Sequence, residues 1–149
     1  MEHAYKAAEL FLSGSNCAQA ITVAFCDVTG LEPSFAAKMA SSFGGGMGRM
    51  REVCGAVSGM LMVLGLLYGY DTPGEDVSKM AQYTVVQELS ARFRERTGSI
   101  VCREILKNPP SDPNPSPRTA EYYAQRPCAR MVLTAAAILD DYIKEHPYV

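Results

Sequence analysis

Apolar residues recur every three or four positions along most of the chain, the spacing that places them on one face of an α-helix. No segment shows the sustained two-residue alternation of a half-buried strand. Helices are therefore expected in six segments, with a short helical turn after the fifth: residues 2–12, 16–28, 33–43, 53–69, 75–96, 100–106 and from 127 onward. The pattern predicts an all-α fold, a single-domain bundle of about five or six helices.

The fourth segment is expected to be the central helix of this bundle. The stretch from Val53 to Tyr70 carries no charge, and its length touches the lower limit of about 17 residues for a membrane span. Glycines dilute it, however, and no second apolar span accompanies it. We therefore expect a helix buried on all sides within the protein and no insertion into a membrane.

A proline-rich segment lies late in the chain. Residues 108–117 contain five prolines, too many for a helix, because proline lacks the backbone N–H and its ring clashes with the preceding turn. We expect residues 107–119 to form a surface loop within the single domain that spans 1–149.

Charge and composition limit which classes of binding partner and which cellular compartment fit the chain. The chain has 14 Lys and Arg residues against 16 Asp and Glu, a formal net charge of −2, with no block of like charge. Such a chain is poorly suited to bind a run of phosphates, so we do not expect nucleic acid as a binding partner. The first residues carry charges where a signal peptide would need its apolar stretch, so we expect a cytoplasmic protein.

The cysteines are the most informative residues of the sequence. Their number is five, and an odd count in a cytoplasmic protein favours metal binding or thiol chemistry over structural disulfides. Four of them are expected in the first turn of a helix: Cys17, Cys54, Cys102 and Cys128. Unpaired N–H groups and the helix dipole favour a thiolate there, which predicts a pKa below the usual value of about 8.5.

The same four cysteines are expected to converge. Cys17 and Cys128 lie on the apolar stripes of their helices, and Cys54 opens the central helix. Cys26 is interpreted as a bystander, because nine residues beyond Cys17 places it about 180° around the helix and about 13 Å along it. The alternative is that the cysteines are small core residues, since free cysteine is commonly buried.

A glycine run precedes Cys54, and it is a candidate ligand-binding turn. Such a run lets the backbone approach a ligand closely and point N–H groups at sulfur or at an anion. A tight turn between helices is an equally good interpretation. The candidate residues are Gly44, Gly45, Gly46, Gly48 and Gly55. The two histidines lie at opposite ends of the chain, away from any nucleophile, which argues against a Cys-His hydrolase.

Five short motifs in order carry a resemblance to a known family: Asn16 to Gln19, Phe43 to Gly48, Cys54 to Gly59, Gly98 to Arg103, and Cys128. Together they resemble the putative redox-active proteins named for the pattern C_GCAxxG_C_C. One departure is that Val53 precedes the second cysteine and Gly55 follows it, where the pattern has glycine and alanine. The resemblance implies a small helical protein whose functional set is Cys17, Cys54, Cys102 and Cys128.

Three functions fit these observations. The four cysteines could bind an iron–sulfur cluster or another metal for electron transfer or sensing, with a redox partner protein that the sequence does not identify. Without metal, two of them could cycle between thiols and a disulfide. In the third function, a structural zinc site holds together a helical module that catalyses nothing. A homo-oligomer is compatible with all three.

Overall fold

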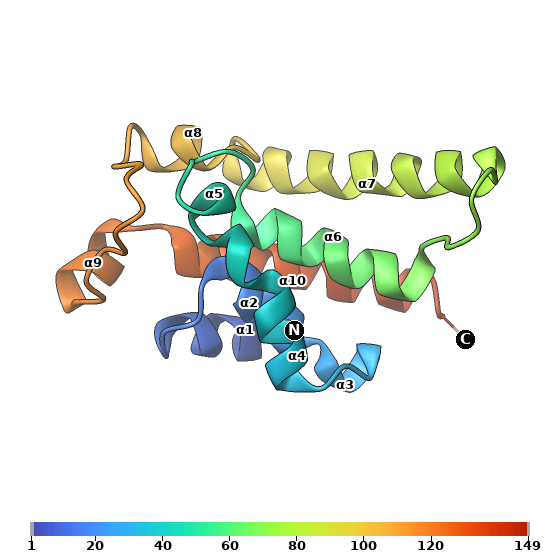
Figure 1. Ribbon diagram of the computed structural model, residues 1–149, viewed down its shortest axis with the longest axis horizontal. Coiled ribbons are helices and arrows are strands. Elements are labelled where there is room, and N and C mark those ends of the chain that lie inside the picture. The colour runs from blue at the N-terminus through green and yellow to red at the C-terminus, as the bar shows by residue number, and fades with distance from the viewer. Residues whose placement is uncertain (1, 149) are drawn as a thin grey trace.

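A computed structural model describes residues 2–148, and it is a bundle of α-helices (Figure 1). The elements follow the order α1 (Glu2–Leu12), α2 (Cys17–Ala24), α3 (Cys26–Thr29), α4 (Pro33–Ala40), η1 (Ser41–Phe43), α5 (Gly44–Met47), α6 (Gly55–Tyr68), α7 (Asp76–Thr97), α8 (Cys102–Leu106), α9 (Ala120–Gln125) and α10 (Cys128–Glu145). Within these residues no strand forms, only an isolated bridge between Val53 and Val101. The predicted all-α class is confirmed.

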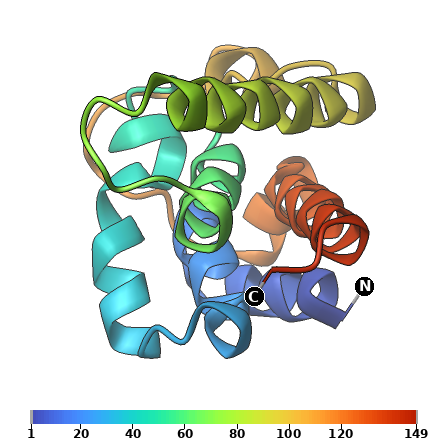
Figure 2. The same ribbon diagram turned by 90° about the vertical axis from the view of Figure 1, so that its right-hand side faces the viewer.

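Six helices of eight or more residues make up the bundle over residues 2–148, in line with the five or six expected: α1, α2, α4, α6, α7 and α10. Figure 2 shows α6 almost end-on in the middle, with α7 above it, α10 beside it and α2 below. In the core, α6 packs on α2, α7 and α10, while α1 packs along α10.

Short segments that the apolar spacing did not predict connect the long helices. The helix expected over 16–28 is interrupted at Phe25, whose φ of −97° and ψ of 13° leave the helical range, so α2 and α3 are separate. Helix α9 was also missed. The Thr119 side chain caps it by accepting a hydrogen bond from the Tyr122 N–H. Between α8 and α9 the chain forms no helix.

The central helix α6 is less enclosed than its composition predicts. Its first turns are buried, but Leu66 near its end is 51% exposed, so the expectation of burial on all sides holds only for the first half. Within residues 2–148, no helix combines the length and apolar character that crossing a membrane requires.

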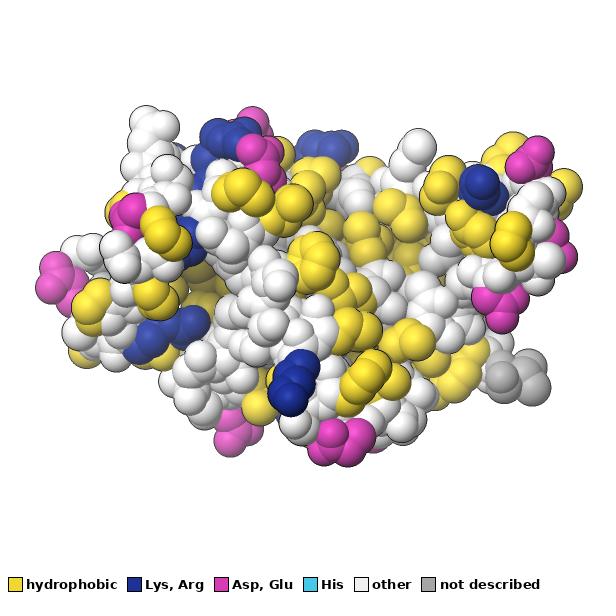
Figure 3. All heavy atoms as spheres, viewed as in Figure 1, with side chains coloured by type: hydrophobic (Ala, Val, Ile, Leu, Met, Phe, Trp, Pro, Cys, Tyr) yellow, Lys and Arg dark blue, Asp and Glu magenta, His cyan; other side chains and the backbone are white. Residues whose placement is uncertain are grey.

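Helix α7 is buried only in its second half, where Leu89, Ser90 and Phe93 are the buried residues. In its first half, Val77 is 79% exposed and Met80 is 65% exposed. Hydrophobic side chains are visible at this end of the molecule, at the right of Figure 3.

Candidate functional site

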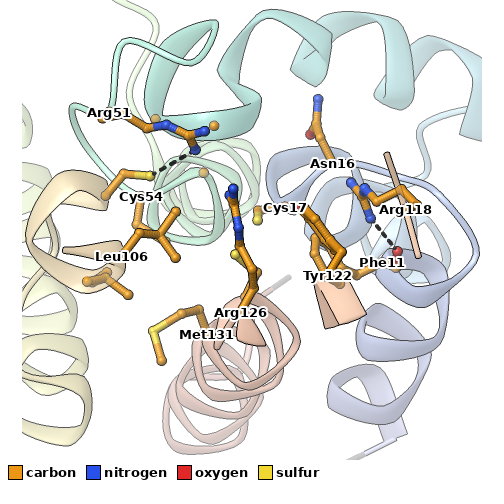
Figure 4. Close-up of a pocket in the computed structure, with 16 residues that line it drawn as sticks. Phe11, Asn16, Cys17, Arg51, Cys54, Leu106, Arg118, Tyr122, Arg126 and Met131 are labelled. Atoms are coloured by element: carbon orange, nitrogen blue, oxygen red, sulfur yellow. Dashed lines mark hydrogen bonds between the residues drawn. The ribbon is translucent and has the colours of Figure 1, made fainter. Parts of the chain in front are cut away.

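Four cysteines from four different helix starts line one small cavity. Its volume is about 60 Å³, and Cys17, Cys54, Cys102 and Cys128 all contribute to its wall. Apolar residues such as Phe11, Leu106 and Met131 complete it (Figure 4). The structure thus brings together the four cysteines that the sequence singled out.

Local sequence explains how each cysteine comes to lie at the start of a helix. Cys17 is the first residue of α2, and Asn16 and Gln19 cap that helix reciprocally through a capping box. Cys102 and Cys128 are the first residues of α8 and α10, while Cys54 is the residue immediately before α6. The predicted positions at helix starts are therefore correct.

The segments that carry Cys54 and Cys102 are joined by backbone hydrogen bonds around the Val53–Val101 bridge. The Cys54 N–H donates to the carbonyl oxygen of Ile100 at 2.7 Å, and the Cys102 N–H donates to that of Glu52 at 2.6 Å. Because each cysteine follows a residue of the bridge, this pairing fixes α6 and α8 with their N-termini at the same cavity.

The glycine run supplies close backbone approach to the cysteines. Gly45 and Gly46 have positive φ angles of 65° and 71°, and both line the cavity. A Cβ at Gly46 would stand 2.7 Å from the Cβ of Cys102, and one at Gly55 would stand 3.1 Å from the Cβ of Cys17. Only residues without a side chain fit there.

Not all of the candidate glycines contact the cavity. Gly44 and Gly48 line an adjoining open groove of about 410 Å³. A Cβ at Gly44 would stand 2.6 Å from the Asn16 side chain, which shows a packing constraint at that position. Gly46 and Gly55 therefore line only the cavity, Gly44 and Gly48 line only the groove, and Gly45 lines both.

Cys17 and Cys128 interact within the cavity, and their pKa values shift in opposite directions. Hydrogen bonding to the Cys17 thiol is the main cause that lowers the pKa of Cys128 to about 7. Positive charge on Arg126, Arg118 and Arg51 acts in the same direction, against the effect of burial. The pKa of Cys17 is raised well above its ordinary value by the same hydrogen bond and by burial.

Cys54 and Cys102, like Cys17, contradict the prediction that every helix start lowers a thiol pKa. Burial raises the pKa of Cys54 to about 12, although the nearby backbone N–H groups of Ala56 and Val57 oppose the rise. Burial also raises the pKa of Cys102, against a hydrogen bond from Arg51. At these positions the cost of burying a charge exceeds the stabilisation that a helix N-terminus gives.

Cys26 lies apart from the cavity, as expected. It is the first residue of α3, and its thiol donates to the carbonyl oxygen of Thr22 at 3.5 Å. It contributes nothing to the cavity wall.

Arginines are the residues that the sequence reasoning missed. Arg51, Arg118 and Arg126 all line the cavity, together with Tyr122. No sequence motif identifies these arginines. The one indication in the sequence was closeness to a cysteine, because Arg51 comes three residues before Cys54 and Arg126 two residues before Cys128.

The four cysteines share a cavity without forming a ready-made metal site. Within residues 2–148, no three Cys, His, Asp or Glu side chains are arranged so that they could hold a metal ion. The donors have the right chemistry for zinc or iron, but their present arrangement does not match the closed ligand sets of such sites.

A comparison with protein-family models identifies the family. The model described as "Putative redox-active protein (C_GCAxxG_C_C)" matches residues 15–142, most of the chain. The chain belongs to this family. No curated protein and no solved structure matches it. Family membership and the cysteine cavity together indicate a redox-active protein that works through cysteines.

Proposed function

We propose that this protein is a thiol–disulfide redox protein in which Cys128 attacks and Cys17 resolves. The observation that carries the proposal is that these two cysteines line the same cavity and interact closely enough for Cys17 to lower the pKa of Cys128. This arrangement places a second thiol beside a sulfur whose pKa is about 7, so that a large fraction of Cys128 is thiolate at neutral pH.

Access also distinguishes Cys128 as the attacking group. It is half-buried, whereas Cys17, Cys54 and Cys102 are buried. A pKa near ambient pH is optimal for an attacking thiol, because it combines a high thiolate fraction with retained nucleophilicity. Cys54 and Cys102, whose pKa values are raised, stay protonated at neutral pH.

The proposed cycle moves two electrons from the cysteine pair to a substrate disulfide. The Cys128 thiolate attacks one sulfur of the substrate, forms a mixed disulfide and releases the other half as a thiolate. Cys17 then attacks the Cys128 sulfur, giving a Cys17–Cys128 disulfide and releasing the second half. The Cys17 proton passes to the departing sulfur, and the thiolate released in the first step takes a proton from solvent, so the substrate leaves as two thiols.

A reductant completes the cycle, so the protein needs a cellular compartment that supplies reduced thiols. A low-molecular-weight thiol or the dithiol of a redox partner protein would return the Cys17–Cys128 disulfide to two thiols. Such reductants are maintained in the cytoplasm, where we place the protein.

Trapping the mixed disulfide tests the proposal. The Cys17→Ala variant should accumulate substrate on Cys128, detected by mass spectrometry of peptides, whereas the wild type should resolve to an internal Cys17–Cys128 disulfide. Cys26→Ala should behave as the wild type, since Cys26 lies outside the cavity. Failure of Cys128 to react in any variant would overturn the proposal.

Metal binding is the second candidate, favoured by the meeting of four cysteines in one cavity. We propose it as the alternative in which a rearrangement brings the four sulfurs around an iron–sulfur cluster or zinc, with helix N–H groups close to the sulfurs. Purification without oxygen separates the candidates. Brown colour with iron and sulfide supports the cluster, stoichiometric zinc supports the structural site, and metal-free protein with titratable thiols supports the thiol cycle.

A further inference from the structure

Arginine side chains line the cysteine cavity and the groove beside it. Arg51, Arg118 and Arg126 line both the cavity and the adjoining groove of about 410 Å³, and Arg49 lines the groove. No described Asp or Glu residue lines either hollow. Positive charge is therefore concentrated there, although the whole chain has a net charge of −2.

Arg51 is buried with part of its guanidinium unsatisfied. The side chain is 4% exposed. Its Nε donates to the carbonyl oxygen of Pro110 at 2.9 Å, and its Nη1 lies 3.7 Å from the Cys102 sulfur. Its Nη2 has no hydrogen-bond partner. Figure 4 shows the guanidinium directed toward the cavity. A buried cation with a free donor is costly unless an anion binds to it.

Arg126 provides a second available guanidinium at the cavity. It is half-buried, and its charged group stacks over the Tyr122 ring at 4.9 Å, a contact that orients the group without using its N–H donors. Arg118 differs, because it donates to the carbonyl oxygens of Phe11 and Ser15. Arg49 is likewise occupied, since it donates to Asp112 and Ser116.

The dimensions favour a small ligand over a folded protein. The groove volume lies within the range of roughly 300–1,000 Å³ typical of small-molecule sites. The cavity that holds the sulfurs is narrow and apolar, so a disulfide on the surface of a folded protein could not enter it readily.

We propose that the substrate is an anionic low-molecular-weight disulfide, whose carboxylate groups bind Arg51 and Arg126 while its sulfur reaches Cys128. This inference rests on the thiol cycle proposed above. Arginine is suited to the role because its planar fork binds a carboxylate through two parallel hydrogen bonds.

The test compares disulfides of different charge. The probes are oxidised glutathione, which is anionic, bis(2-hydroxyethyl) disulfide, which is neutral, and cystamine, which is cationic. The rate of mixed-disulfide formation on Cys128 is measured in the Cys17→Ala background. Each rate is divided by the rate of the same probe with a free small thiol, which removes intrinsic reactivity. The anionic probe should react fastest on this scale, and added salt should reduce its advantage.

Substitution of Arg126 tests the assignment at one residue. Arg126→Gln should lower the ratio of the anionic to the neutral rate by about tenfold, the effect of one charge-assisted hydrogen bond, whereas Arg126→Lys should lower it less. Taking the ratio cancels any change in the reactivity of Cys128 itself. Arg96→Gln removes an equal charge from an exposed position that lines neither hollow, and should leave the ratio unchanged.

The outcomes separate the two proposals. If no probe reacts with Cys128, the thiol cycle itself is overturned. If all three react with equal normalised rates, or if Arg126→Gln leaves the ratio unchanged, the anionic substrate is overturned while the thiol cycle stands. Circular dichroism of every variant establishes that the helices are intact.

Discussion

Cys17 and Cys128, separated by most of the chain, lie at the first residues of α2 and α10 and line one cavity, where hydrogen bonding to the Cys17 thiol lowers the pKa of Cys128. The contact makes the two cysteines chemically unlike. Cys128 is favoured as a thiolate, and Cys17 keeps its proton until an attack on Cys128 removes the hydrogen bond.

The reactivity of Cys128 should follow its lowered pKa. Alkylation by iodoacetamide requires the thiolate, so its rate should fall about tenfold for each pH unit below the midpoint and level off above it. The midpoint should be near the pKa of about 7. Mass spectrometry of peptides at each pH measures the rate, with Cys26 as an internal reference. A midpoint near the free-cysteine value of about 8.5 would contradict the prediction.

Removal of the hydrogen-bond donor should shift that midpoint upward. Cys17→Ala deletes the main cause of the lowered pKa of Cys128 while leaving the arginines in place. Cys17→Ser keeps a donor and should shift the midpoint less. The same alkylation measurement checks both variants. Equal midpoints in Cys17→Ala and wild type would show that the arginines alone stabilise the thiolate.

Two glycines of α6 should respond oppositely to the same substitution. A Cβ at Gly59 would stand 2.9 Å from the carbonyl oxygen of Ala18, whereas a Cβ at Gly65 would have no neighbour within 4 Å. Gly59→Ala should reduce the free energy of unfolding by about 1–3 kcal/mol through overpacking. Gly65→Ala should raise it by up to about 1 kcal/mol, because alanine favours the helix. Urea titrations followed by circular dichroism measure both.

Within the glycine run, substitution of Gly46 by alanine should strongly reduce the free energy of unfolding. This residue combines a φ of 71° with a Cβ position 2.7 Å from the Cβ of Cys102. Gly46→Ala should therefore cost about 2–5 kcal/mol from backbone strain and overpacking. The matched control is Gly74→Ala, where φ is 86° but no atom lies within 4 Å, and the cost should be about 1–2 kcal/mol. Similar losses in both variants would show that contact with Cys102 contributes nothing.

Features encoded locally were predictable from the sequence. The helix starts and the cysteines beside them depend on neighbouring residues, and the structure agrees. The placement of Arg51 was not predictable, because its partner Pro110 lies far along the chain in a segment without helical structure. The thiol pKa values depend on burial and on contacts between distant helices, which helix position alone does not give. The exposure of the first half of α7 was not predictable for a related reason, since spacing predicts an apolar face but not how far a neighbouring helix covers it.

The bridge between Val53 and Val101 closes the base of a long helical hairpin, which separates the cysteine cavity from the tip of that hairpin. The chain leaves the cavity after Cys54, runs out along α6 and returns along α7 to Cys102, so the turn at Thr72 to Gly74 lies at the far end of a helical hairpin (Figure 1). A fluorophore or an affinity tag attached at that tip would report on the protein or immobilise it while leaving the thiols free to react.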